Sequence, residues 1–124
     1  ILTDEEFKEM KKGAKEEQFR KILAYWNKSF GNANETLYNE HMNTYFNRVD
    51  YAFFNFQTIT NRDGAKTDRG KIYILHGKPD EITTDVRNGK NSEIWYYRKI
   101  NQAFIFEVVS VGNYKLVEIE KKDF

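Results

Sequence analysis

Three carboxylates, one arginine and one histidine in the middle of the chain are the side chains best suited to chemistry. They are Asp68, Arg69, His76, Asp80 and Glu93. Two carboxylates that face each other can have their pKa values driven apart, and hydrolases use such pairs as acid and base. A cleft that gathers these groups would therefore support hydrolysis or the binding of a small ligand.

Each of these charged residues also has a structural explanation. Asp68 suits the positive N-terminal end of a helix, and Asp80 follows the single proline in a turn, where its carboxylate can bond to the backbone. Glu93 begins a strand, where it can pair with Arg69 or Lys71. A buried ion pair of Arg69 with either Glu93 or Asp80 would hold the short helix against the sheet. The structural explanation is the simpler one, so we predict no catalytic residue.

The rest of the sequence holds no recognisable catalytic or cofactor motif. The chain has no cysteine, and none of its three serines lies in a Gly-x-Ser-x-Gly turn. It also lacks the glycine-rich loops that bind nucleotides. His76, Asp80 and Glu81 could supply three metal ligands, but their spacing fits no standard zinc pattern. We therefore expect neither a cofactor nor a metal, and a non-enzyme is favoured over an enzyme.

Overall composition restricts the classes of partner. Lysine and arginine total 20 and aspartate and glutamate 19, so the net charge of +1 gives no strong field to attract phosphate backbones. Nucleic acid is therefore not an expected partner. No run of 18 apolar residues occurs, which predicts no transmembrane segment. The chain begins with Ile1, which is typical of a processed form or an excised domain.

Helices are expected in the first half of the chain, over about residues 3–56. Thr3 and Glu6 have the spacing of a capping box that starts the first helix. Apolar side chains that recur at helical spacing predict a second helix at residues 15–28 and a third at residues 35–56. Two residues between these helices have the chemistry of a break and a cap, Gly13 and Asn34.

The segment 64–82 contains a stretch that could be a helix or a strand. Residues 72–75 have strand propensity. Thr67 is a good helix N-cap, however, and Gly77 fits the left-handed position that ends a helix, with a proline soon after it. These signals at both ends favour a short helix at about residues 68–76.

Residues 81–119 have the alternation of an antiparallel sheet. The dipeptide Asn88-Gly89 is a strong hairpin signal between the first two strands. The expected strands are 81–86, 92–98, 103–109 and 113–119. The charged tail, residues 118–123, is expected to fray.

These elements predict one α+β domain over residues 1–124. N-terminal helices pack on one face of a small three- or four-stranded antiparallel sheet, and the short helix leads into the strands. The aromatic content of 16% lets a single domain of this length bury a substantial core.

Several short blocks also follow one another in a specific order. They are Gly64-Ala-Lys-Thr-Asp68, Thr67-Asp-Arg-Gly-Lys-Ile-Tyr-Ile-Leu-His-Gly77, Pro79-Asp-Glu-Ile82, Glu93-Ile-Trp-Tyr-Tyr97, Phe104-Ile-Phe106 and Gly112-Asn-Tyr-Lys-Leu-Val117. In this order they resemble the bacterial GWxTD domain family, which is named for a Gly-Trp-x-Thr-Asp motif. The resemblance covers about residues 3–117, with Ala65 in place of the motif tryptophan.

The resemblance implies an exported bacterial protein of the cell envelope, in the periplasm or associated with the outer membrane. It implies no established reaction. If the motif tryptophan serves as a binding platform in relatives, this chain has lost it at Ala65.

The sequence therefore favours a non-enzymatic protein-interaction or accessory module whose partner is a protein. Binding would use the exposed sheet face or the groove between helix and sheet. The residues expected to contribute are Thr67, Asp68, Arg69, Asp80, Glu93, Trp95 and Tyr97. The alternative is a small-ligand-binding or hydrolytic domain with a carboxylate/Arg/His cleft, and the oligomeric state is left open.

Overall fold

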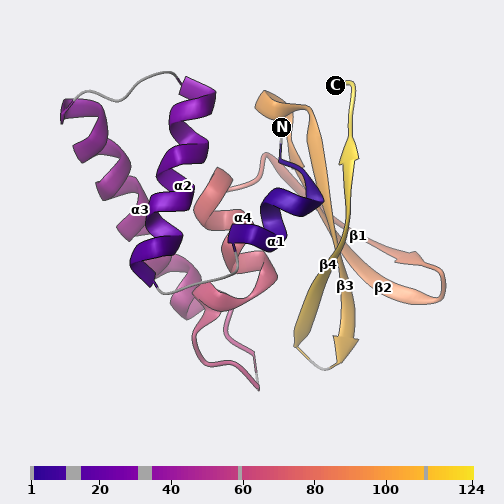
Figure 1. Cartoon of the computed structure of the whole chain (residues 1–124). Helices are drawn as coiled ribbons and strands as arrows, with labels where there is room; N and C mark the ends of the chain where they lie inside the picture. The colour runs from indigo at the N-terminus through magenta and orange to yellow at the C-terminus, as the bar shows by residue number, and fades with distance from the viewer. Residues whose placement is uncertain (1, 11–14, 31–34, 59, 111) are drawn as a thin grey trace.

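The computed structural model of the chain describes residues 2–10, 15–30, 35–58, 60–110 and 112–124. In this part of the chain the helices lie on one side of a four-stranded sheet (Figure 1). The elements are α1 (Asp4–Met10), α2 (Lys15–Phe30), α3 (Glu35–Asn55), α4 (Asp68–His76), β1 (Glu81–Arg87), β2 (Lys90–Tyr97), β3 (Gln102–Ser110) and β4 (Asn113–Lys121), with 3₁₀ turns at Gly64–Lys66 and Arg98–Ile100. The predicted α+β fold is confirmed.

The first helix begins as the sequence predicts. The amide of Glu6 donates to Thr3 Oγ1 over 3.1 Å, and the amide of Thr3 donates to Glu6 Oε1 over 3.2 Å, which is a reciprocal capping box. The second helix, α2, continues past its predicted end to Phe30. The predicted break at Gly13 and the predicted cap at Asn34 lie outside the described residues. No described helix combines the length and the apolar character that a membrane span requires.

The ambiguous segment is a helix, α4, as the signals at its ends predict. The amide of Gly70 donates to Thr67 Oγ1 over 3.1 Å, so Thr67 is the N-cap. At the other end, the amide of Gly77 donates to the carbonyl oxygen of Tyr73 over 2.7 Å. Gly77 has a φ of 78° and a ψ of −156°, which lies outside the left-handed helical region that the sequence suggested. The chain therefore leaves α4 in an extended conformation open mainly to glycine.

The strands pair antiparallel in the order β1-β2-β3-β4. Asn88 and Gly89 form the turn between β1 and β2 with φ values of 52° and 75°, which fits a type I′ hairpin. β4 runs to Lys121, where it still pairs with Gln102 of β3. The prediction that the charged tail frays is therefore wrong for residues 118–121, because these residues are paired along the length of β3.

The main core lies between the sheet and the helices α3 and α4. Because side chains alternate between the two faces of a strand, the inner face of the sheet carries Trp95, Tyr97, Phe104 and Phe106. Trp95, Phe104 and Phe106 are each at most 1% exposed. The helices contribute Tyr45, Val49, Ala52, Ile72, Ile74 and Leu75 to the same core, and Phe56 joins it directly after the end of α3.

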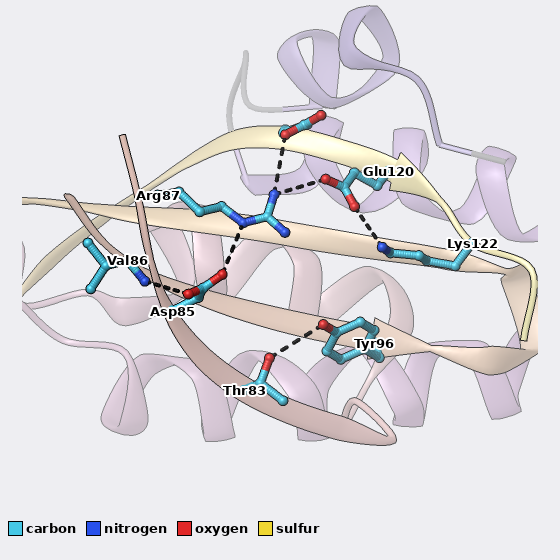
Figure 2. Close-up of polar contacts among 8 residues, drawn as sticks. Thr83, Asp85, Val86, Arg87, Tyr96, Glu120 and Lys122 are labelled. Carbon is cyan, nitrogen blue, oxygen red and sulfur yellow. Dashed lines mark hydrogen bonds and ion pairs between the residues drawn. The ribbon is translucent and has the colours of Figure 1, made fainter. Parts of the chain in front are cut away.

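The outer face of the sheet carries a smaller buried cluster of Ile94, Ala103 and Ile105. Arg87 of β1 reaches the opposite edge strand, with its Nη1 2.9 Å from Glu120 Oε1 and 3.8 Å from Glu118 Oε2 (Figure 2). Edge strands of a flat four-stranded sheet would lie about 14 Å apart, since neighbouring strands are about 4.8 Å apart. The sheet therefore curls toward this face, and charged side chains frame the cluster.

Candidate functional site

Arg69 and Glu93, both predicted site residues, connect the start of α4 to the sheet. Arg69 Nη1 lies 3.5 Å from Glu93 Oε1, and the same oxygen accepts a hydrogen bond of 2.7 Å from the indole nitrogen of Trp95. The guanidinium carbon of Arg69 also lies 3.8 Å from the ring centre of Tyr114 and 5.2 Å from that of Phe56. Of the two predicted pairs of Arg69, the structure forms the one with Glu93.

Thr67 and Asp68 fix the same junction through the backbone. Asp68 Oδ2 accepts a hydrogen bond of 2.8 Å from the amide of Leu116 in β4. Thr67 caps α4, and its hydroxyl donates to the carbonyl oxygen of Gly64 over 2.7 Å. The motif residues Thr67, Asp68 and Arg69 therefore hold α4 against the sheet.

The motif glycines allow a close backbone contact at this junction. A Cβ atom at Gly64 would overlap the carbonyl oxygen of Ala52 in α3, and one at Gly70 would overlap the carbonyl oxygen of Gly64. Ala65, which replaces the motif tryptophan, is 8% exposed and belongs to the main core. The motif segment thus packs against α3 and connects α4 to the sheet.

The remaining predicted site residues lie elsewhere. Asp80 Oδ2 accepts from the amide of Arg98 over 2.7 Å, at the end of α4 opposite to Asp68. The Trp95 ring is 1% exposed and lies in the core, so it is not part of a binding surface. Tyr97 is 5% exposed, but it lines a cavity. The predicted set is therefore split between the two ends of α4.

A cavity of about 600 Å³ lies where the C-terminal end of α4 meets α2, α3 and the end of β2. Its lining residues are Tyr25, Trp26, His41, Thr44, Arg48, Leu75, His76, Lys78, Asp80, Tyr97, Lys99 and Ile100. The sequence pointed only to His76, Asp80 and Tyr97 in this set. The others come from separate helices and loops, so no spacing in the sequence connects them.

Three side chains bond the last carbonyl groups of α4 beside this cavity. Arg48 Nη1 donates to the carbonyl oxygens of Ile74 and Leu75 over 3.0 and 3.2 Å. The indole nitrogen of Trp26 donates to the Leu75 oxygen over 2.9 Å, and the Tyr97 hydroxyl donates to the Gly77 oxygen over 2.7 Å. Burial raises the pKa of Tyr97, so the hydroxyl keeps the proton that it donates. The helix terminus is thus satisfied by donors, including one cation.

His76, the last residue of α4, is enclosed by aromatic rings. Its ring centre lies 5.4 Å from those of Tyr97 and Phe104 and 5.9 Å from that of Tyr25. Burial, followed by the charge of Arg48, lowers the pKa of His76 to about 3. The His76 ring is therefore neutral at pH 7, and Arg48 supplies the cation at this helix end. Its Nε2 is buried and has no hydrogen-bond partner in the described part of the chain.

The described residues contain no group of three His, Asp or Glu side chains placed to hold a metal ion. His76, Asp80 and Glu81, which the sequence offered as a possible set, are not such a group. Glu81 is exposed and starts β1, while His76 packs among aromatic rings beside the cavity.

Comparison with known proteins identifies one family. The family model of the GWxTD domain matches residues 1–121. Neither the curated proteins nor the solved structures contain a significant match to the chain. Because the family match spans nearly the whole chain, this protein belongs to the GWxTD domain family.

Proposed function

We propose that this domain is a non-enzymatic protein-interaction module of the bacterial cell envelope. The observation that carries the proposal is a group of exposed phenylalanines on α3. Phe46, Phe53 and Phe54 are 49%, 38% and 72% exposed, and we call these three residues the α3 aromatic patch. Single exposed apolar residues are common, but clustered aromatic rings are enriched at protein interfaces.

The α3 aromatic patch is distinct from the buried side of the same helix. Phe46 and Phe53 are seven residues apart, which places them above one another on an α-helix. Phe53 and Phe54 touch edge to face, with ring centres 5.0 Å apart. The core side of α3 begins at the adjacent residues Tyr45 and Ala52. One side of α3 is thus packed in the core, and the neighbouring side carries the α3 aromatic patch, which is open to solvent.

This placement moves the expected binding surface from the sheet to α3. The inner face of β2 and β3 is occupied by the core, and the outer face of the sheet is framed by charged residues such as Arg87, Glu118 and Glu120. On the outer face of β2, the hydroxyl of Tyr96 lies 3.4 Å from Thr83 Oγ1 (Figure 2). A partner protein that buries aromatic rings therefore finds its best match on α3.

The contacts of the carboxylates weigh against the hydrolytic alternative. Asp68 bonds the Leu116 amide, Asp80 bonds the Arg98 amide, and Glu93 bonds Trp95 and Arg69. A hydrolytic pair needs two carboxylates that converge on one cleft. The engaged positions of these groups, at opposite ends of α4, support structural roles.

The envelope location rests on the family resemblance and needs its own test. The full-length protein, expressed at native level with a C-terminal epitope tag, would be followed by cell fractionation. Recovery with the periplasm or the outer membrane supports this part of the proposal. Recovery with the cytoplasm contradicts it and leaves the binding proposal standing.

The binding proposal is tested by site-specific photo-crosslinking in the native cell. A photoreactive phenylalanine analogue replaces Phe54, so that the aromatic character of the patch is kept. The same analogue at Val117 of β4, which is 47% exposed, is the matched control on another face. A discrete protein adduct at position 54 that is absent at position 117 supports the proposal. Absence of an adduct at 54, or the same adducts at both positions, contradicts it.

A further inference from the structure

The cavity at the C-terminal end of α4 has an excess of positive charge. Its walls contain the cations Arg48, Lys78 and Lys99 and one carboxylate, that of Asp80. Lys78 and Lys99 are exposed and have no ion-pair partner in the described part of the chain. An anion that enters the cavity could therefore pair with Lys78 and Lys99, since neither lysine is engaged in an ion pair with a described residue.

Two side chains that line the cavity, those of Arg48 and His76, have nitrogen atoms without a hydrogen-bond partner among the described residues. Arg48 uses Nη1 for the two helix carbonyls, and its Nε and Nη2 have no hydrogen-bond partner among the described residues. The buried Nε2 of His76 also lacks one. A buried polar atom without a partner is costly, so a ligand that supplies an acceptor is favoured. Neutral histidine can present a proton at Nε2 and so donate to such an acceptor.

The end of a helix normally repels anions, but here its carbonyl groups are already bonded. The Leu75 oxygen accepts from Trp26 and Arg48, and the Gly77 oxygen accepts from Tyr97. These donors offset the negative end of the α4 dipole. The cavity is thus compatible with an anion despite its position.

Apart from Thr44 and His41, which are polar, the remaining lining is aromatic or aliphatic. Tyr25, Trp26, Tyr97, Leu75 and Ile100 all contribute to the walls. The volume of about 600 Å³ is in the range that encloses a small organic molecule. Asp80 on the same wall disfavours a doubly charged group such as phosphate. The lining therefore fits a singly charged anion attached to an apolar body.

We propose that this cavity binds a carboxylate carried on an apolar, preferably aromatic, group. The carboxylate would be held by Arg48 and His76, with Lys78 and Lys99 at the entrance, and the apolar group would lie against Tyr25 and Trp26. The same chemistry is found in a free carboxylic acid and in the C-terminus of a peptide that ends in an aromatic residue. This site is separate from the α3 aromatic patch, so the proposal of a carboxylate site can be tested independently of the proposed function.

The test is a titration followed by ¹⁵N NMR on the 124-residue chain. The indole N–H of Trp26 reports on the cavity, and that of Trp95, which lies in the core, is the internal reference. The probes are 3-phenylpropionate, the neutral 3-phenylpropanol, and inorganic phosphate. We expect a saturable shift of the Trp26 signal with 3-phenylpropionate only. No saturable shift, or equal shifts with the alcohol or with phosphate, would overturn the proposal.

Two further probes identify the source of the carboxylate. They are N-acetyl-Gly-Gly-Phe with a free C-terminus and the same peptide as its amide. Tighter binding of the free peptide than of 3-phenylpropionate supports the proposal with a peptide terminus as the ligand. Weaker binding supports it with a free acid as the ligand. Binding of the amide as tight as that of the free peptide contradicts a carboxylate site.

A charge-matched pair of variants tests the residues. The double variant Lys78→Gln/Lys99→Gln removes two exposed cations at the entrance, and we expect it to weaken 3-phenylpropionate binding about fivefold, as for two partly screened charge contacts. The control, Lys66→Gln/Lys115→Gln, changes the net charge equally at exposed residues outside the cavity and should bind like the parent. Equal affinities of the two double variants would overturn the assignment.

Discussion

The backbone of Gly70 lies so close to the carbonyl oxygen of Gly64 that no side chain fits between them. The contact joins α4 to the 3₁₀ turn Gly64–Lys66, which packs in turn on the carbonyl oxygen of Ala52 in α3. Backbone atoms cannot yield as a flexible side chain can, so a methyl group here must displace the helix.

We expect Gly70→Ala to lower the free energy of unfolding by about 3 kcal/mol or more, because its Cβ overlaps backbone atoms. Gly112→Ala is the control, since nothing lies within 4 Å of its Cβ and only its φ of 75° is strained. It should cost about 1–2 kcal/mol. Chemical denaturation of both variants measures the difference, and equal losses would contradict the close contact at Gly70.

A second prediction concerns the pair of Arg69 and Glu93. Their side chains are only 15% and 17% exposed. Glu93→Ala removes the charge partner of Arg69 and the acceptor of Trp95, so we expect a loss of about 2–4 kcal/mol. In the pair of Lys90 and Glu107 the lysine side chain is 60% exposed, so Lys90→Ala serves as the comparison and should cost less than about 1 kcal/mol. A loss at Glu93 no larger than that at Lys90 would show that the junction does not depend on this pair.

His76 should make the stability of the protein depend on pH. Burial lowers its pKa to about 3 in the folded state, against about 6.5 when unfolded. Above pH 6.5 both states are neutral and the full stability is present. As the pH falls from 6.5 toward 3, only the unfolded state takes up the proton. The free energy of unfolding therefore decreases, by up to about 1.4 kcal/mol per pH unit from this group.

The variant His76→Phe isolates this effect because it keeps an aromatic ring and every other titrating group. Chemical denaturation between pH 7 and pH 5 should show a smaller decrease in the unfolding free energy for the variant than for the parent protein. Identical decreases would mean that His76 is accessible to protons in the folded state.

The bridge from Arg87 to Glu118 and Glu120 should hold the curl of the sheet. The hydrogen bond to Glu120 raises the pKa of Arg87, and Lys122 and Arg87 lower that of Glu120, so each charge stabilises the other. We expect Arg87→Gln to increase hydrogen exchange of the amides at residues 118–121 while changing global stability little. Exchange rates equal to those of the parent protein would show that strand pairing alone holds the tail.

The sequence predicted the fold well where a signal is local. The capping box at Thr3, the cap at Thr67 and the turn at Asn88 depend on neighbouring residues, and the structure has all three. The tail was mispredicted because residues 118–121 are stabilised by β3 and by Arg87, which is about thirty residues away.

The candidate site was harder to predict for the same reason. Arg69 and Glu93 could be paired from their charges and the expected helix–sheet junction. The hydrogen bond from Arg48 to the Leu75 carbonyl could not be predicted, because it joins two different helices and no sequence spacing relates the two residues. The burial of His76 could not be predicted, because it depends on rings from α2, β2 and β3.

The most direct test of the proposed function is the affinity of the partner captured at position 54. Phe54→Ser removes the most exposed ring of the α3 aromatic patch, and Val117→Ser removes an exposed apolar side chain of β4. With folding verified by circular dichroism, we predict that Phe54→Ser raises the dissociation constant at least about tenfold and Val117→Ser less than about twofold. An unchanged affinity of Phe54→Ser, or an equal loss in both variants, would contradict the proposed function.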